Sequence, residues 1–237
     1  MVTLVLLPGL DGTGRLLADL AASFGPTVEV IVATYPPDLA LDYAGLEPIA
    51  RSFLPQDRPY FLLAESFSGP LGITIAASAP PGLLGLVLCC SFVRNPVPLA
   101  GLLRPAIARL PLGQLPFGLL CFFLLGRFSS CRLRRALARS LSRVAPEVLR
   151  SRTLAVLATD VSASLPRIRV PVLYLRASED RIVPSSAARL VVSLLPQVQV
   201  LEFPAPHFLL QVLPLAVSSR LSRFMDEIMS PGRAMPS

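Results

Sequence analysis

The sequence predicts an α/β protein in which helices cover both faces of a mostly parallel sheet of about six strands. Continuous apolar runs, such as residues 2–7 and 60–64, are typical of strands that are buried on both faces. These runs alternate with segments in which apolar residues recur at helical spacing. The 237 residues show no internal repeat and suit one domain with a sizeable core, spanning 1–237.

The strands and helices are expected in a regular order along the chain. The predicted strands cover residues 2–7, 28–34, 60–65, 83–90, 170–175 and 198–203. The predicted helices cover residues 16–24, 41–54, 71–79, 185–195 and 209–228. Prolines mark two of the ends: Pro36 and Pro37 close the second strand, and Pro80 and Pro81 follow the third helix. Alternation of this kind indicates parallel pairing of the strands.

The alternation is interrupted once, after the fourth strand. Residues 92–145 hold several prolines, an apolar stretch with several phenylalanines and an arginine-rich helix over residues 131–144. The apolar stripe of that helix comprises Leu133, Leu137, Leu141 and Val144. Pro146 suits the first turn of a helix, where the alternation resumes. We therefore predict an insertion over residues 92–145 in a core formed by residues 1–91 and 146–230.

Ser66 lies where the third strand changes into a helix, and its small neighbours Ala64 and Ser68 would let strand and helix pass close together. Such a turn exposes the hydroxyl, which needs a base within hydrogen-bond reach to become a nucleophile. The only histidine, His207, follows the sixth strand, and Asp180 follows the fifth. Because the ends of parallel strands share one edge of the sheet, these three side chains are expected to meet there.

This pattern resembles the α/β-hydrolase superfamily. Residues 64–68 are similar to its nucleophile elbow, G-x-S-x-G, with both glycines replaced, and D-x-x-V-P from Asp180 is similar to its acid loop. The order serine, aspartate, histidine is also that of the superfamily. The resemblance implies that the insertion is a helical cap and that two N-terminal antiparallel strands of many members are missing. It further implies an oxyanion hole formed by the backbone N–H groups of Leu10 and Phe67.

Other interpretations of these residues remain open. Glu179 is the alternative acid, whereas Asp160 falls within a helical pattern, which disfavours it. Asp180 could instead be a carboxylate favoured at a helix N-terminus. The glycine-rich turn over residues 8–14 could bind phosphate, but it lacks the G-x-x-x-x-G-K signature.

Composition excludes several classes of function. The formal net charge is +7 and every basic residue is arginine, but basic and aromatic residues are not interleaved, which disfavours nucleic-acid binding. With one histidine and no ligand spacing among the cysteines, we expect no metal and no cofactor. The four cysteines are expected to be buried free thiols. No apolar run suits a membrane span and no signal peptide is evident, so we expect a cytoplasmic protein.

The sequence therefore predicts a serine esterase acting through Ser66, His207 and Asp180 on a small apolar ester. Phenylalanines 117, 122, 123 and 128 are expected to pack the cap onto the core, some of them lining the acyl pocket. The arginine-rich helix is either a solvated face or a docking surface for an acidic carrier protein, a CoA thioester or an anionic membrane surface. The alternatives are a thioesterase or acyltransferase, and a binding protein without turnover.

Overall fold

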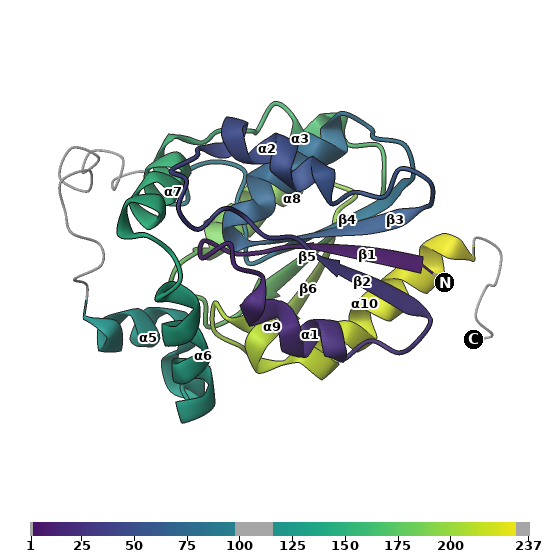
Figure 1. The fold of residues 1–237 in the computed structure, drawn as a ribbon. Helices are drawn as coiled ribbons and strands as arrows, with labels where there is room; N and C mark the ends of the chain where they lie inside the picture. Colours follow the sequence, from purple (N-terminus) through teal and green to yellow (C-terminus); the bar gives the residue numbers. More distant parts are fainter. Residues whose placement is uncertain (1, 98–115, 231–237) are drawn as a thin grey trace.

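The computed structural model of the chain describes residues 2–97 and 116–230 and contains one parallel sheet with the strand order β2-β1-β3-β4-β5-β6 (Figure 1). Its strands are β1 (Val2–Leu7), β2 (Val28–Val32), β3 (Tyr60–Glu65), β4 (Leu83–Cys89), β5 (Val172–Ala177) and β6 (Gln199–Phe203). Each strand is parallel to its neighbours, so the carboxyl ends of all of them lie at one edge of the sheet. The prediction of a parallel α/β sheet is confirmed.

Helices cover both faces of this sheet (Figure 1). One face carries α2 (Tyr43–Ser52), α3 (Gly69–Ala77) and α8 (Ser185–Leu194); the other carries α1 (Ala18–Ala22), α9 (Leu209–Val212) and α10 (Pro214–Met229). Successive residues of β3 alternate between the two layers: Leu62 packs in the first cluster and Leu63 in the second. Both faces are buried, which explains why the strand is apolar up to its last residue, Glu65.

Among the described residues between β4 and β5, three α-helices lie beyond the carboxyl edge of the sheet (Figure 1). They are α5 (Phe117–Leu125), α6 (Cys131–Leu141) and α7 (Pro146–Ala158). We refer to α5 and α6 as the cap helices. The predicted division into core and insertion stays a prediction, and residues 98–115 of the predicted insertion lie outside the described residues. Within the two described ranges, no helix has both the length and the apolar character that crossing a membrane requires.

The last predicted helix is interrupted in the structure. The sequence pattern predicts one helix over residues 209–228, but α9 ends at Val212 and α10 begins at Pro214. Leu213 between them has φ −125° and ψ 49°, outside the helical region. The cause is Pro214, whose ring disfavours the helical conformation in the preceding residue but suits the first turn of a new helix.

Candidate active site

Ser66 occupies the sharp turn between β3 and α3. Its φ of 47° is uncommon for a residue other than glycine, so neighbouring contacts must stabilise the turn. The Ser91 hydroxyl donates a hydrogen bond of 2.6 Å to the Ser66 carbonyl oxygen. Tyr174 in turn donates its hydroxyl to the Ser91 carbonyl oxygen at 2.5 Å. The buried ends of β4 and β5 therefore fix the position of the serine.

The helix after Ser66 packs so closely against the strands that only small residues fit. A Cβ atom added to Gly72 would lie 2.7 Å from the Cβ of Ala64, which explains the need for a small residue at position 64. Ser68 is small but also makes specific contacts. Its hydroxyl donates to the Pro8 carbonyl oxygen at 2.5 Å and lies 2.7 Å from the hydroxyl of Tyr35. Ser68 therefore joins the turn at Ser66 to the loop after β1, which a glycine at position 68 could not do.

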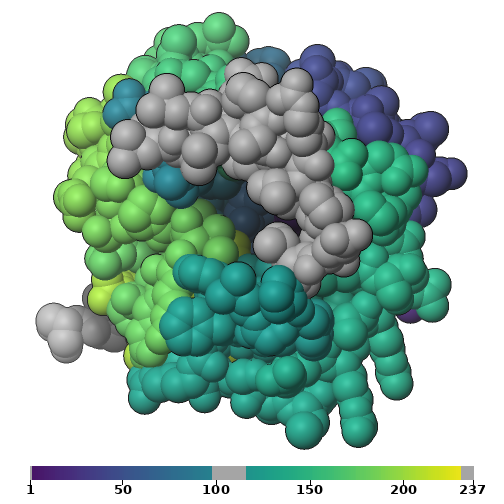
Figure 2. All heavy atoms as spheres, turned by 90° about the vertical axis from the view of Figure 1, so that its left-hand side faces the viewer, coloured from purple at the N-terminus to yellow at the C-terminus, as the bar shows by residue number. Residues whose placement is uncertain are grey.

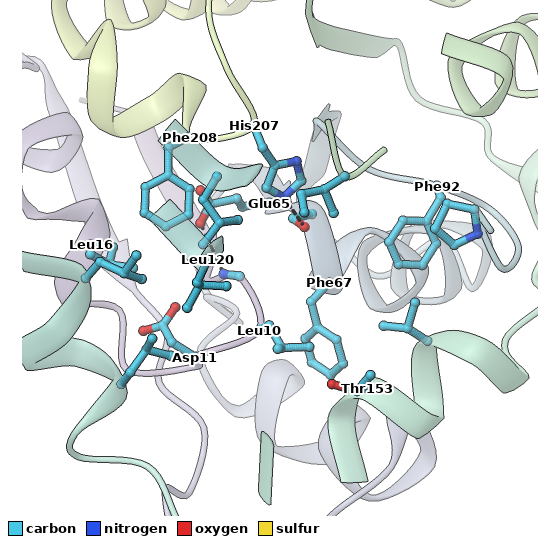
Figure 3. A pocket seen from close by; sticks show the side chains of 18 of the residues that line it. Leu10, Asp11, Leu16, Glu65, Phe67, Phe92, Leu120, Thr153, His207 and Phe208 are labelled. Carbon is cyan, nitrogen blue, oxygen red and sulfur yellow. Dashed lines mark hydrogen bonds between the residues drawn. The ribbon is translucent and has the colours of Figure 1, made fainter. Parts of the chain in front are cut away.

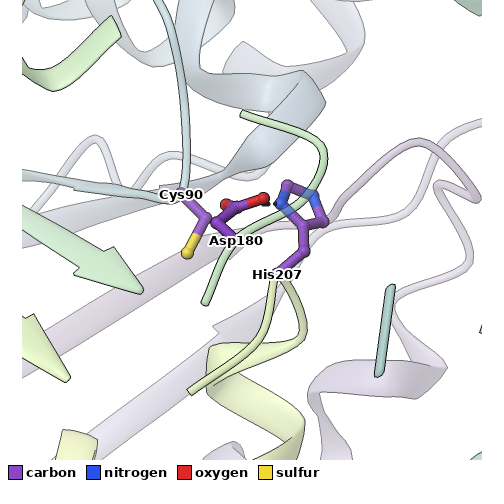
Figure 4. A group of neighbouring side chains, drawn as sticks. All are labelled: Cys90, Asp180 and His207. Carbon is purple, nitrogen blue, oxygen red and sulfur yellow. Dashed lines mark hydrogen bonds and ion pairs between the residues drawn. The ribbon is translucent and has the colours of Figure 1, made fainter. Parts of the chain in front are cut away.

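The structure brings Ser66, His207 and Asp180 together, as expected from their places after β3, β6 and β5. Ser66 Oγ lies 2.9 Å from His207 Nε2. His207 Nδ1 lies 2.8 Å from Asp180 Oδ2, and Figure 4 shows this second contact. The other carboxylate oxygen of Asp180 accepts the backbone N–H groups of Ile182 and Val183 at 2.8 and 2.9 Å. With Nδ1–H donating to Asp180, Nε2 is left to accept the serine proton.

The alternative acids lie elsewhere. Glu179 forms an ion pair with Arg127, with 2.6 Å between Oε1 and Nη2. Asp160 is exposed and accepts the N–H of Ser162 at 2.9 Å. It follows the end of α7, so the expectation that it lies within a helix is wrong. Asp180 is thus the carboxylate that the structure brings to His207.

The loop after β1 is fixed at almost every peptide group. Gly9 N–H donates to Glu65 Oε2 at 3.1 Å, and Gly9 C=O accepts Gly12 N–H at 3.0 Å. Gly12 C=O accepts the N–H of Tyr35 at 2.7 Å. The N–H of Leu10 makes no hydrogen bond with any residue that the structure describes, and Leu10 lines the cavity beside Ser66. It is therefore a free donor in a fixed loop, as an oxyanion hole requires.

Phe67, the second expected donor, directly follows Ser66 and also lines the cavity. Its carbonyl oxygen accepts the hydroxyl of Tyr43 at 2.8 Å, and the two rings stack with 4.9 Å between their centroids. These contacts fix the backbone whose N–H group would serve the oxyanion.

Sequence reasoning missed two buried charged residues beside this loop. Glu65 is 6% exposed and lines the cavity (Figure 3); its Oε1 accepts Gln211 Nε2 at 2.8 Å. Burial raises the pKa of Glu65 to about 7; the hydrogen bond from Gln211 opposes this rise and the charge of Asp11 adds to it. Arg152 of α7 is fully buried against the same loop. The position of Glu65 next to Ser66 was a usable signal, but nothing in the sequence pattern marked Arg152.

A cavity of about 280 Å³ lies between the sheet edge and the cap helices. Its lining includes Ser66, His207, Glu65 and Asp11. Apolar side chains form most of the remaining wall (Figure 3). Figure 2 looks onto this side of the molecule and shows a hollow with α5 (teal) along its rim. The cavity therefore offers a largely apolar space next to the serine.

The cap helices contribute leucines to this cavity: Leu120 and Leu124 from α5, and Leu137 and Leu141 from α6. The expectation that phenylalanines of the cap line it is wrong. Among them, Phe122 is 54% exposed and is covered on one face by the guanidinium of Arg181, at 4.2 Å from the ring centroid. Because α5 is apolar on all sides, its sequence did not reveal which side faces inward.

The arginine-rich helix α6 packs through its predicted apolar stripe, and its arginines are exposed. Arg132 forms an ion pair with Asp19. On the inner side, Ser140 donates to Asp11 at 2.7 Å and lies 2.6 Å from the hydroxyl of Thr13. Helix α6 is thus tied to the loop after β1. Docking of an acidic carrier protein or an anionic surface on its arginines stays a prediction.

The donor atoms of Cys90, Asp180 and His207 lie within 4.8 Å of one another (Figure 4). The hydrogen bond between Asp180 and His207 already uses Nδ1 of the histidine. The pKa of the Cys90 thiol is raised: a hydrogen bond with Cys89 lowers it, but burial and the charge of Asp180 outweigh this. The hydrogen bond between Asp180 and His207 gives both side chains a role that needs no metal. Cys131 is exposed, against the expectation that all four cysteines are buried.

The sequence matches no protein-family model and no curated protein. Solved structures are similar over nearly their whole length. An esterase from Exiguobacterium antarcticum is 13% identical with a TM-score of 0.82, covering 97% of this chain and 92% of that one. A hydrolase from Oleispira antarctica is 15% identical with a TM-score of 0.82, and the match covers 95% of this chain and 91% of that one. An enol-lactonase from Burkholderia xenovorans is 19% identical with a TM-score of 0.79, and the match covers 95% of this chain and 92% of that one. This protein therefore has the fold of the α/β-hydrolase superfamily.

Proposed function

We propose that this protein is a serine hydrolase that cleaves carboxylic esters of apolar acyl groups. The observation that carries the proposal is the chain of hydrogen bonds from Ser66 through His207 to Asp180, in which Ser66 and His207 line a largely apolar cavity. The names of the similar structures, an esterase and an enol-lactonase among them, agree with this chemistry.

In the proposed reaction, Ser66 Oγ attacks the ester carbonyl carbon while His207 Nε2 takes the serine proton. The carbonyl oxygen becomes an oxyanion, which the N–H groups of Leu10 and Phe67 stabilise. His207 then gives the proton to the leaving alcohol, and the acyl group stays on Ser66. Water, activated by His207, releases the acid and restores the serine. Asp180 keeps the imidazole in the required tautomer and stabilises its charged form.

The walls of the cavity support a neutral, apolar acyl group. Its described lining contains two carboxyl groups, Asp11 and Glu65, and no arginine. A negatively charged acyl group would meet these carboxyl groups in a largely apolar cavity, where charge repulsion is stronger than in water. Straight or branched hydrocarbon chains would instead contact the leucines of the cap helices.

The test of the proposal is Ser66→Ala. We expect turnover of p-nitrophenyl butyrate to fall by about 10⁴-fold or more, because the nucleophile is lost. The matched control is Ser78→Ala, a serine at the end of α3 that does not line the cavity; its hydroxyl donates to the Ile75 carbonyl oxygen and accepts from Arg51. Circular dichroism establishes that both variants are folded. Undiminished turnover by folded Ser66→Ala would refute the proposal.

The same preparation distinguishes the alternatives. Transfer of the butyryl group to an added alcohol, in preference to water, would identify an acyltransferase. Faster cleavage of a butyryl thioester than of the matching ester would identify a thioesterase, which the exposed arginines of α6 favour if the thioester is carried by an acidic partner. Failure of a fluorophosphonate probe to label Ser66 would instead indicate a binding protein.

A further inference from the structure

Arg152 is a fully buried arginine whose hydrogen bonds go to backbone carbonyl groups. Its Nη1 donates to the carbonyl oxygens of Leu10 and Asp11 at 2.9 and 2.8 Å, and its Nη2 donates to that of Pro36 at 2.9 Å. The arginine belongs to α7, whereas its partners belong to the loops after β1 and β2. One side chain therefore connects three separate segments.

A buried charge is costly unless its surroundings compensate for it. Burial lowers the pKa of Arg152, and no carboxylate in the described part of the chain forms an ion pair with it. The guanidinium also faces the ring of Tyr35, with 5.7 Å from Cζ to the ring centroid. The compensation comes from the backbone carbonyl groups that accept its hydrogen bonds and from the charge of Asp11, which opposes the effect of burial on the pKa.

The loop is shaped to fit this side chain. Gly12 has φ 68°, and a Cβ atom at that position would lie 2.4 Å from Arg152 Nη1. Any larger residue would thus be strained and would also displace the guanidinium. The loop and Arg152 therefore fit each other as one unit.

We propose that Arg152 is a positioning residue that holds the loop after β1 so that the N–H of Leu10 points at the oxyanion. The inference rests on the proposed function. Glu65 fixes the N–H of Gly9 before Leu10, and Arg152 fixes the carbonyl groups of Leu10 and Asp11 after it. Because the backbone is fixed on both sides of the Leu10 N–H, that N–H group is held in one direction. A donor fixed before the reaction begins needs no reorganisation in the transition state.

The kinetic test is Arg152→Met, which keeps apolar volume but removes the donors. We expect kcat to fall about 10- to 100-fold while KM changes much less, since a misplaced oxyanion donor weakens the transition state more than the ground state. Arg152→Lys, with a single ammonium donor, should be intermediate and guards against a methionine variant that fails to fold. Arg150→Met, on the same helix, is the control, because the loop after β1 receives no hydrogen bond from Arg150.

A second measurement is independent of turnover. Hydrogen exchange of the backbone amides in residues 9–13 should be faster in Arg152→Met than in the wild type or in Arg150→Met. Unchanged exchange together with an unchanged kcat would overturn the inference, as would equal losses in all three variants. If the wild type does not cleave esters, the proposed function fails. Even then, unchanged hydrogen exchange in Arg152→Met would by itself reject the inference that Arg152 holds the loop after β1.

Discussion

Glu65 places a carboxyl group in an apolar cavity, next to the proposed nucleophile. Burial raises its pKa from 4.5 to about 7, and the charge of Asp11 adds to this rise. The hydrogen bonds from Gln211 and the Gly9 N–H, and the charge of His207, oppose the rise. A carboxyl group whose pKa is higher in the folded than in the unfolded chain binds more protons when folded. Its contribution to stability is therefore fully present below about pH 4.5 and is lost as the pH rises through about 7.

We predict that Glu65→Gln flattens this part of the stability profile. The amide oxygen can still accept the Gly9 N–H. The new NH2 group faces Gln211 Nε2, and once the Gln211 amide turns over it can donate to Gln211 Oε1, which has no partner among the described residues. In urea titrations, the unfolding free energy of the variant should fall less between pH 4.5 and 7 than that of the wild type, by at most about 3 kcal/mol. Glu47→Gln, which alters a partly exposed ion pair with Arg51, is the control. Parallel profiles for wild type and Glu65→Gln would contradict the prediction.

The candidate triad was accessible to sequence reasoning because each member follows a strand and has a distinct chemical type. The supporting residues were not accessible in this way. The need for a small residue at position 68 could be predicted, but the hydroxyl of Ser68 bonds to Pro8 in another loop. Arg152 likewise binds backbone carbonyl groups, which every residue type possesses. Contacts between a side chain and distant backbone leave no pattern in the sequence.

At the scale of elements, the unit that positions Ser66 is β3, the turn and α3. Gly69 lies at the start of α3, and a Cβ atom there would be 1.6 Å from the hydroxyl oxygen of Ser91. That hydroxyl could not stay in place, so its hydrogen bond to the Ser66 carbonyl would be lost. The close approach of α3 to β4 therefore requires glycine at this position.

We predict that Gly69→Ala lowers the unfolding free energy by about 1–3 kcal/mol or more, the usual cost of overpacking. Ester cleavage should fall with it, because Ser66 loses its support. Gly118→Ala is the matched control: no atom of the described residues lies within 4 Å of the added Cβ, and alanine in a helix is favoured over glycine by up to about 1 kcal/mol. Urea unfolding of the two variants checks the contrast. Equal stabilities would mean that Ser91 can move without cost.

Prediction of elements succeeded where the pattern is local. The strands alternate with helices, and prolines mark several boundaries, so the sheet and its class followed from the sequence. The break at Leu213 was missed because the apolar spacing continues across Pro214. An apolar stripe indicates which side of a helix is buried, but it does not predict a local break in the backbone.

At the scale of the whole molecule, the carboxyl edge of the sheet and the cap helices contribute different kinds of residue to the cavity, which α7 also lines. The carboxyl edge of the sheet supplies the polar groups, whereas α5 and α6 supply leucines. The first part could be predicted, since parallel strands bring their carboxyl ends together. The orientation of the cap helices could not, since it depends on tertiary packing.

The division of tasks predicts that the cap sets the acyl length. Leu141 of α6 is partly buried and lines the cavity, so Leu141→Trp should shorten the space for the acyl chain without touching the triad. We expect kcat/KM for p-nitrophenyl octanoate to fall at least about 10-fold relative to that for the acetate, because each methylene that loses its place costs about 1 kcal/mol or more. Ala138→Trp, on the exposed side of the same helix, is the control and should leave the ratio unchanged. A fall of equal size for both esters would mean that the acyl chain lies elsewhere, and the leucines of the cap would then serve only to pack it.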